Sequence, residues 1–297
     1  MTGVKTTLWP GFAMLLLAIL TGCAPYEVQF EGPYDDSKNT AGSYIPNEIL
    51  TVENGQIRLY PINLTEGKTL SNLPAGIEKA SINHAHTRIA YKIPGQNIVI
   101  IDTAGASIDV VANSAAASWF DWHVNNQTLY MLNGTTLSFW GPAVSVISTN
   151  LSNFFPQGST DRTMSTVAIA ADGTVVATYR YFSGSSVGRM GWVSLAGAVK
   201  AVNLTSSNET GRWMRVSREG DIILCGTTFG TTSINNFRLN LTQDVVTQPT
   251  ARSFAAPGPS NDLLVYATSG KLNISDTNSG TVLNRNINTA SLTALDW

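Results

Sequence analysis

The chain has 297 residues, of which 43% are hydrophobic and 13% are charged, with 18 basic residues against 20 acidic ones. A hydrophobic share of this size can bury a core, and low charge with many aliphatic residues excludes a long disordered protein. The near balance of charges excludes a basic nucleic-acid-binding surface as the main function. Glycine is frequent, with 25 residues, which favours a fold of many short strands and turns.

The first 22 residues are predicted to be a secretory signal peptide. Lys5 is followed by an apolar run from Phe12 to Leu20, which is shorter than the ~20 residues of a membrane-spanning helix. The next residues, Leu20-Thr-Gly-Cys23, resemble the lipobox of bacterial lipoproteins. The resemblance implies that the chain is cleaved before Cys23, and that Cys23 carries palmitate-type acyl chains at the mature N-terminus. The alternative is an ordinary signal peptide with an incidental cysteine.

The resemblance also implies where the protein is located, and it leaves one cysteine without lipid. Ala24, rather than Asp, follows Cys23, which in lipoproteins of a Gram-negative cell favours the outer membrane. Residues 23–45 are predicted to be the lipidated cysteine and a flexible tether, because they carry scattered Pro, Gly and acidic residues without a period. With Cys23 acylated, only Cys225 remains, and its apolar surroundings predict a buried, inert thiol.

Residues 46–297 contain a repeat. An apolar strand, a polar turn and a second apolar strand recur, and the first strands end at anchors. These anchors are Ile82, Trp122, Ile169, Val216, Ala255 and Trp297, which are 40, 47, 47, 39 and 42 residues apart. Such spacing is close to the blade length of a β-propeller, about 40–45 residues for four strands.

The two ends of this region complete one blade. Residues 46–79 supply a second, third and fourth strand without an innermost one, whereas Ser291–Trp297 is an innermost strand with nothing after it. Pairing them closes a ring and removes exposed sheet edges. The sequence therefore predicts an all-β, six-bladed β-propeller over residues 46–297, with four-stranded blades and closure by the C-terminal strand pairing with the N-terminal blade.

Two of the repeat units resemble those of a known family. Ile169-Ala-Ala-Asp-Gly and His86-Thr-Arg-Ile-Ala-Tyr are similar to the WD-like propeller repeat of TolB-type periplasmic proteins. The similarity is spread over residues 46–297. It implies the propeller fold and not the role of TolB itself.

Few residues point to catalysis or to a cofactor. His84 and His86 share one turn, but no third ligand is visible nearby, so we expect solvated turn residues and no metal site. The chain carries no Gly-x-Ser-x-Gly elbow, no His-Glu-x-x-His and no Cys-x-x-Cys. We therefore predict no cofactor and no catalytic residues, although an active site assembled from several blades stays open.

A second set of candidates belongs to the innermost strands. An aspartate in such a strand could face the central funnel and bind a ligand or an ion, or it could hydrogen-bond to a neighbouring blade. The funnel candidates are Asp121, His123, Arg215 and Asp296.

Three long connections are predicted on one face of the propeller, at residues 150–164, 181–188 and 226–235. They would form a wall rich in aromatic residues and arginine, a composition typical of protein interfaces. The alternative is that the aromatic residues pack within their own loops. The predicted interaction residues are Phe154, Phe155, Arg162, Arg180, Tyr181, Phe182 and Phe229.

These observations predict a membrane-anchored envelope lipoprotein that acts as a non-catalytic protein-interaction or assembly scaffold through one propeller face. Its expected partners are the membrane, through the N-terminal lipid, and another envelope protein, with no nucleic acid. The alternative function is a propeller that binds or processes a saccharide or another small ligand in the central funnel.

Overall fold

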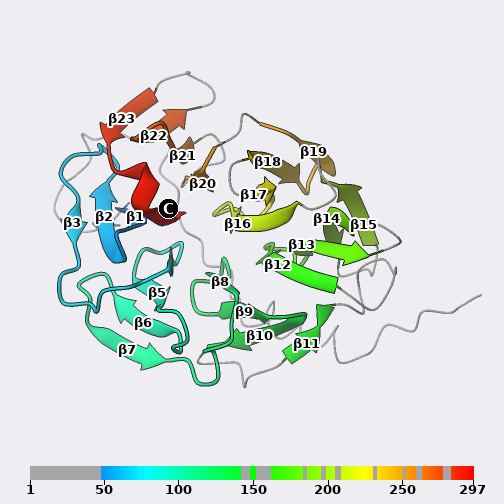
Figure 1. Cartoon of the computed structure of the whole chain (residues 1–297), viewed down its shortest axis with the longest axis horizontal. Helices are drawn as coiled ribbons and strands as arrows, with labels where there is room; N and C mark the ends of the chain where they lie inside the picture. Colours follow the sequence, from blue (N-terminus) through cyan, green and yellow to red (C-terminus); the bar gives the residue numbers. More distant parts are fainter. Residues whose placement is uncertain are drawn as a thin grey trace, which may run out of the picture.

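The computed structural model describes residues 48–141, 148–151, 162–182, 186–194, 199–204, 209–229, 233–249, 252–258, 263–276 and 282–297. Its strands form six four-stranded antiparallel sheets, which stand as blades around a common axis (Figure 1). The predicted six-bladed β-propeller is thereby confirmed. The predicted signal peptide, Cys23 and the tether lie outside the described residues.

Each blade begins with an innermost strand at the axis and ends with an outermost strand at the rim of the ring. From the axis outwards, blade 1 consists of β24 (Leu292–Asp296), β1 (Glu48–Glu53), β2 (Gln56–Pro61) and β3 (Lys68–Thr69). Blade 2 consists of β4 (Lys79–Ile82), β5 (Arg88–Lys92), β6 (Val99–Asp102) and β7 (Ser107–Val110). Blade 3 consists of β8 (Trp119–Trp122), β9 (Leu129–Asn133), β10 (Thr136–Trp140) and β11 (Ser148–Asn150).

The remaining blades follow the same order. Blade 4 consists of β12 (Arg162–Ile169), β13 (Val175–Phe182), β14 (Ser186–Val193) and β15 (Val199–Asn203). Blade 5 consists of β16 (Thr210–Val216), β17 (Ile222–Phe229), β18 (Ser233–Asn240) and β19 (Val245–Thr247). Blade 6 consists of β20 (Phe254–Pro257), β21 (Leu263–Thr268), β22 (Lys271–Asp276) and β23 (Val282–Asn286). A short 3-10 helix, η3 (Thr289–Ser291), leads into β24.

The ring is closed by the C-terminal strand. β24 pairs antiparallel with β1, with Leu50 opposite Asp296 and Val52 opposite Ala294. The last strand of the chain therefore supplies the innermost strand of the blade that the first described strands begin, as predicted. β1 has a paired neighbour on both sides, which removes the open edge that would otherwise invite aggregation.

Local sequence explains the strands and their turns. β10 alternates between buried Leu137 and Phe139 and partly exposed neighbours, the period of two expected of a strand. The turn between β1 and β2 is Asn54-Gly55, whose φ angles of 51° and 73° are both positive. Such angles suit Asn and Gly and give the tight turn that matches the twist of a hairpin.

Indole groups join neighbouring blades. Trp119 Nε1 of blade 3 donates to Val167 O of blade 4 at 2.9 Å, and Trp213 Nε1 of blade 5 donates to Ser253 O ahead of blade 6 at 3.0 Å. Trp122 Nε1 of blade 3 donates to Ser81 O of blade 2 at 3.2 Å. All three tryptophans are buried, so each combines apolar packing with a hydrogen bond that fixes the spacing of two blades.

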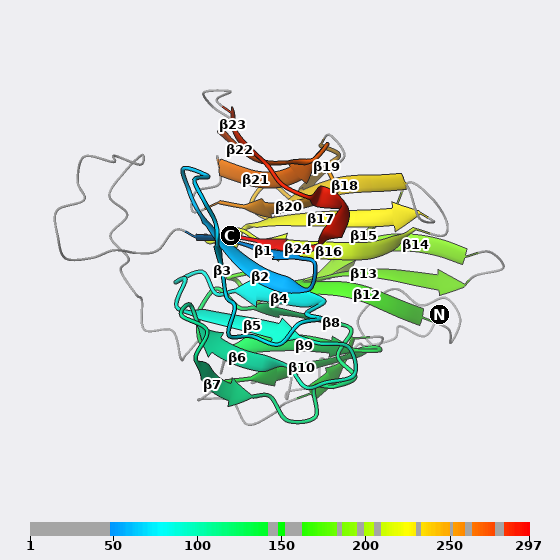
Figure 2. The ribbon, with the colours of Figure 1, turned by 60° about the vertical axis from the view of Figure 1, so that its left-hand side comes forward.

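Two predictions from the sequence need correction. The strand partner of Pro257 is Leu264, as that of Val216 is Ile223, so the anchor of blade 6 is Pro257 and not Ala255. The expected loops at 181–188 and 226–235 are mostly strand, because β13, β14, β17 and β18 have eight residues each. These four strands extend blades 4 and 5 toward one side of the ring (Figure 2). Their hairpins continue the strand pairing beyond the ends predicted from the sequence.

No helix in the part of the chain that the structure describes is long and apolar enough to cross a membrane.

Candidate functional site

The six innermost strands run in the same direction along the axis, which gives the propeller two different faces. We call the face where these strands begin the upper face, and the face where they end the lower face. The β13–β14 and β17–β18 hairpins are also on the upper face, because each second strand returns to the side from which its innermost strand started.

One residue of each innermost strand forms a ring around the axis. The members are those just before the six repeat anchors, with Ala256 placed by the corrected register. They are Ser81, Asp121, Ala168, Arg215, Ala256 and Asp296, each no more than 5% exposed. One base and two acids therefore meet at the centre of a propeller whose other central side chains are small.

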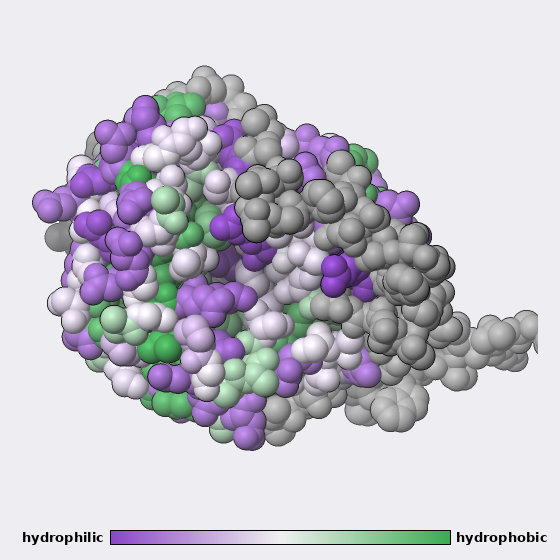
Figure 3. All heavy atoms as spheres, in the orientation of Figure 1, coloured by the Kyte–Doolittle hydropathy of each residue, from purple (hydrophilic) through white to green (hydrophobic). Residues whose placement is uncertain are grey.

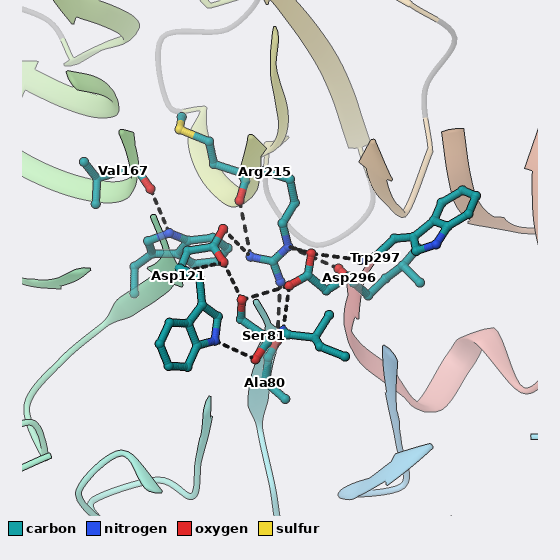
Figure 4. Close-up of polar contacts among 12 residues, drawn as sticks. Ala80, Ser81, Asp121, Val167, Arg215, Asp296 and Trp297 are labelled. Carbon is teal, nitrogen blue, oxygen red and sulfur yellow. Dashed lines mark hydrogen bonds and ion pairs between the residues drawn. The ribbon is translucent and has the colours of Figure 1, made fainter. Parts of the chain in front are cut away.

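Arg215 crosses the axis from blade 5 and is held from several sides (Figure 4). Its Nη1 atom lies 3.2 Å from Asp121 Oδ2 of blade 3, and its Nε atom lies 3.1 Å from Asp296 Oδ1 of blade 1. Its Nη2 atom donates to Ala80 O of blade 2 at 3.4 Å. The guanidinium carbon also lies 5.2 Å from the ring centre of Trp119. One side chain thus connects four blades.

The carboxylates of Asp121 and Asp296 also accept hydrogen bonds from blade 2 and from backbone N–H groups. Ser81 Oγ contacts Asp121 Oδ1 and lies 2.8 Å from Asp296 Oδ2, which also accepts from Ile82 N at 3.0 Å. Asp121 Oδ1 accepts from the backbone N of the next residue, Trp122, at 2.9 Å. We call Ser81, Asp121, Arg215 and Asp296 the central clasp.

The electrostatics of the central clasp follow from its burial. Burial lowers the pKa of Arg215, but Asp296 and Asp121 together more than offset this effect and raise it, so the guanidinium stays charged. Burial raises the pKa of Asp296 to about 6, against the opposing effect of Arg215. The clasp is therefore a fixed ion-pair network, and its groups use their hydrogen-bonding capacity on one another.

The structure brings three of the four funnel candidates together and separates the fourth. Asp121, Arg215 and Asp296 form the clasp, whereas His123 lies at the end of β8, nearer the lower face. Its Nδ1 atom accepts from Asn125 N at 3.2 Å, and burial lowers its pKa to about 4. The repeat alone does not reveal that Arg215 has two partners, although aligning the positions just before each anchor places one base between two acids.

The other two histidines also lie toward the lower face, and neither is a freely solvated turn residue as predicted. His86 is 3% exposed, has a φ of 52°, and accepts at Nδ1 from Glu48 N at 3.2 Å. Burial lowers the pKa of His84 to about 3 and that of His86 to about 4. Across the described residues, no three His, Cys, Asp or Glu side chains are grouped closely enough to hold a metal ion.

A small hollow with a cavity volume of about 20 Å³ opens on the upper face above the clasp. Figure 3, viewed along the ring axis, shows hydrophilic residues around a depression near the centre. The described residues that line it come from five blades and include three cations, Lys79, Arg212 and Arg215, but no carboxylate. Lys79 and Arg212 were not predicted as site residues. The signal available for Lys79 is its position two residues before Ser81, on the same side of β4.

The predicted interaction residues are placed only in part. Phe154 and Phe155 lie outside the described residues. Arg162 pairs with Tyr181 between β12 and β13, Phe182 with Ser186 and Phe229 with Ser233, so these residues belong to the upper ends of blades 4 and 5. Arg180 lies on the same stretch of β13 and is partly exposed. The backbone positions therefore agree with one shared face, which is the face of the hollow.

The buried thiol is confirmed. Cys225, in the second strand of blade 5, is 0% exposed, and burial strongly raises its pKa. A thiol of this kind is protonated at neutral pH and is a poor nucleophile.

Comparison with known proteins supports the architecture. TolB from Acinetobacter baumannii superposes with a TM-score of 0.61 at 14% sequence identity, over 86% of this chain and 67% of that one. The fold is a TolB-like six-bladed β-propeller. Hydrazine synthase of Kuenenia stuttgartiensis is also similar, with a TM-score of 0.52 at 11% identity, over 83% of this chain and 81% of that one. No protein-family model and no curated protein matches the chain. At these identities the likeness concerns the fold alone.

Proposed function

We propose that this propeller is a non-catalytic interaction scaffold that binds a protein partner through its upper face. The observation that carries the proposal is the central clasp. Its acids and its base neutralise one another, and each is about 5% exposed, so they leave no open acid–base pair at the axis. The partner is then expected to bind at the outer part of the upper face, where blades 4 and 5 extend furthest and where Arg180 is partly exposed.

We further propose that the scaffold is anchored in the cell envelope through a lipid on Cys23. Support comes from the lipobox-like Leu20–Cys23 behind an apolar run. Intact-protein mass spectrometry of the wild type is expected to show loss of residues 1–22 and a gain of acyl chains. A Cys23→Ala variant is expected to keep its signal and lose the acyl mass. A wild-type protein without added acyl mass would contradict the anchor.

Partner binding is tested by replacing two of the interaction residues that the sequence predicts. Replacing both Phe154→Ala and Phe182→Ala is expected to lower recovery of a co-purified envelope protein at least fivefold while the melting temperature stays within a few degrees. The matched control is Gln127→Ala, an exposed residue in the turn after β8 on the lower face. Equal recovery of the partner with this double variant and with the wild type would overturn the proposal that the partner binds to the upper face.

A second candidate function is the binding of a small ligand, and the cationic hollow is the observation that favours it. If the ligand uses the clasp itself, Asp121→Ala removes binding and leaves stability unchanged. We expect instead that this variant loses several degrees of melting temperature, because it leaves Arg215 short of one carboxylate in a buried site. An unchanged melting temperature would contradict this structural role and support a role of Asp121 in ligand binding.

A further inference from the structure

The hollow on the upper face is lined by three cations and, among the described residues, by no carboxylate. Arg215 at its base is already paired with two carboxylates of the clasp. Lys79 and Arg212 are different, because among the residues that the structure describes no carboxylate lies within ion-pair distance of either one. The hollow therefore presents two cations that an anion can pair with.

Both cations are held in place by aromatic rings instead of acids. Lys79 Nζ lies 5.5 Å from the ring centre of Trp119, and the guanidinium carbon of Arg212 lies 4.6 Å from that of Phe254. Lys79 also donates to Ser118 O. Stacking on a ring fixes a cation without using all of its hydrogen-bond donors, since a guanidinium has five and an ammonium has three. Both residues thus keep donors for a ligand.

The partial loss of water around Lys79 and Arg212 also favours a bound anion. Burial lowers the pKa of Lys79, with Glu78 opposing the effect, and burial lowers the pKa of Arg212. A cation that loses water without gaining a counter-ion is destabilised in its charged form, and a bound anion removes this penalty. The arrangement is the reverse of the clasp, where acids compensate the buried base.

The size of the hollow limits the ligand. A cavity volume of about 20 Å³ holds roughly one water-sized group, so the hollow takes the charged end of a ligand and not its whole body. Lys79 and Arg212 line the hollow from different blades, and such cations donate strong hydrogen bonds to carboxylate oxygens. The exposed Thr293 adds a hydroxyl to the same lining.

We propose that the hollow binds the carboxylate of a small organic acid through Lys79 and Arg212, with the rest of the acid outside the hollow. The site rests on the small-ligand function proposed above and is independent of partner docking. Replacement of Phe154 and Phe182, two of the interaction residues predicted from the sequence, is expected to leave it intact, whereas loss of Lys79 or Arg212 removes it.

The test is isothermal titration of the full-length protein, purified in detergent, with D-glucuronate, D-glucose and inorganic phosphate in parallel. We expect saturable binding of one glucuronate per chain, no binding of glucose, and weaker binding of phosphate. Arg212→Gln and Lys79→Gln are each expected to weaken glucuronate binding about tenfold or more. Lys271→Gln, at an exposed lysine on β22 that does not line the hollow, serves as the matched control and is expected to bind like the wild type.

Several outcomes would overturn the proposal. They are absence of glucuronate binding, equal binding of glucose, tighter binding of phosphate, or full binding by Arg212→Gln. Arg212 keeps part of its side chain in solvent, so its variant is expected to keep the fold and stays informative even if Lys79→Gln, which removes a contact to the neighbouring blade, is unstable. Wild-type partner recovery together with absent glucuronate binding would refute this site and leave the scaffold function standing.

Discussion

At the scale of single residues, Arg215 is the side chain on which the centre depends. It pairs with Asp121 and Asp296, and each of the three is about 5% exposed. Removing one partner of such a buried network leaves the others uncompensated, whereas removing all the charges together is much less harmful. The clasp therefore holds four blades in one arrangement, and its effect on stability is testable.

The Arg215→Met variant is expected to lose about 3–5 kcal/mol of the free energy of unfolding, because two buried carboxylates then face each other without a cation. Urea denaturation measures the loss, with Arg238→Met on β18 as the control. Adding Asp121→Asn and Asp296→Asn to Arg215→Met is expected to restore part of the stability. A loss below about 1 kcal/mol in the single variant would show that the clasp contributes little.

The histidines near the lower face predict a pH dependence of stability. Burial lowers the pKa values of His84, His86 and His123 to about 3, 4 and 4, from an ordinary value of about 6.5. Arg218 and Arg215 oppose the charging of His84, as do the other two histidines, and Arg218 also opposes that of His86. The unfolded chain binds protons first, so the stability that these residues contribute is present above about pH 6.5 and is lost as the pH falls toward 4.

Asp296 acts in the opposite direction. Its raised pKa, about 6, favours the protonated folded form at low pH. Three histidines outweigh one aspartate, so we expect a net loss on the order of a few kcal/mol between pH 7 and pH 5. Urea midpoints at the two pH values measure it, and the triple variant His84→Gln, His86→Gln, His123→Gln should flatten the dependence. An unchanged dependence in this variant would contradict the assignment.

At the scale of elements, β24 and β1 decide whether the ring is closed. They join the last strand of the chain to the first described strand, and Val52 and Ala294 face each other in this pair and belong to the same buried cluster. Every other blade is made of four described strands that follow one another in the sequence. Separation of the chain ends would therefore open the sheet of blade 1.

A disulfide across this pair should stabilise the whole ring. Val52→Cys with Ala294→Cys closes a loop of nearly the whole propeller, and long loops give the largest gain, about 2–5 kcal/mol. The oxidised protein is expected to melt several degrees above its reduced form, whereas the single variant Val52→Cys should show no redox effect. Failure of the pair to oxidise in the folded protein would contradict the strand register.

The sequence is a good guide to the elements and a poor one to the clasp. Anchors such as Trp122 and Val216 repeat because every blade needs a buried strand end, and that repetition predicts blade number and closure. Arg215, Asp121 and Asp296 occupy the same position of the repeat, but the residue type at that position differs between blades, and their meeting depends on ring geometry. The length of β17 exceeds the prediction because Gly226, Thr227 and Thr228 near its end are residue types common in loops.

At the scale of the whole molecule, the two faces of the propeller differ in charge and in the length of their hairpins. The lower face has buried, neutral histidines, whereas the upper face has the cations of the hollow and the longest hairpins. Between them the clasp crosses the axis and its side chains contact four blades at that level. These differences support the proposal that a partner binds to the upper face.

Photo-crosslinking in intact cells tests this central claim most directly. A photoreactive amino acid is placed at Thr293 on the upper face or at Gln127 on the lower face, two exposed positions, and the adducts are identified by mass spectrometry. We predict one dominant envelope-protein adduct from Thr293, and its absence from Gln127. An equal yield of that adduct from both positions, or a dominant adduct from Gln127 alone, would contradict the assignment of the upper face.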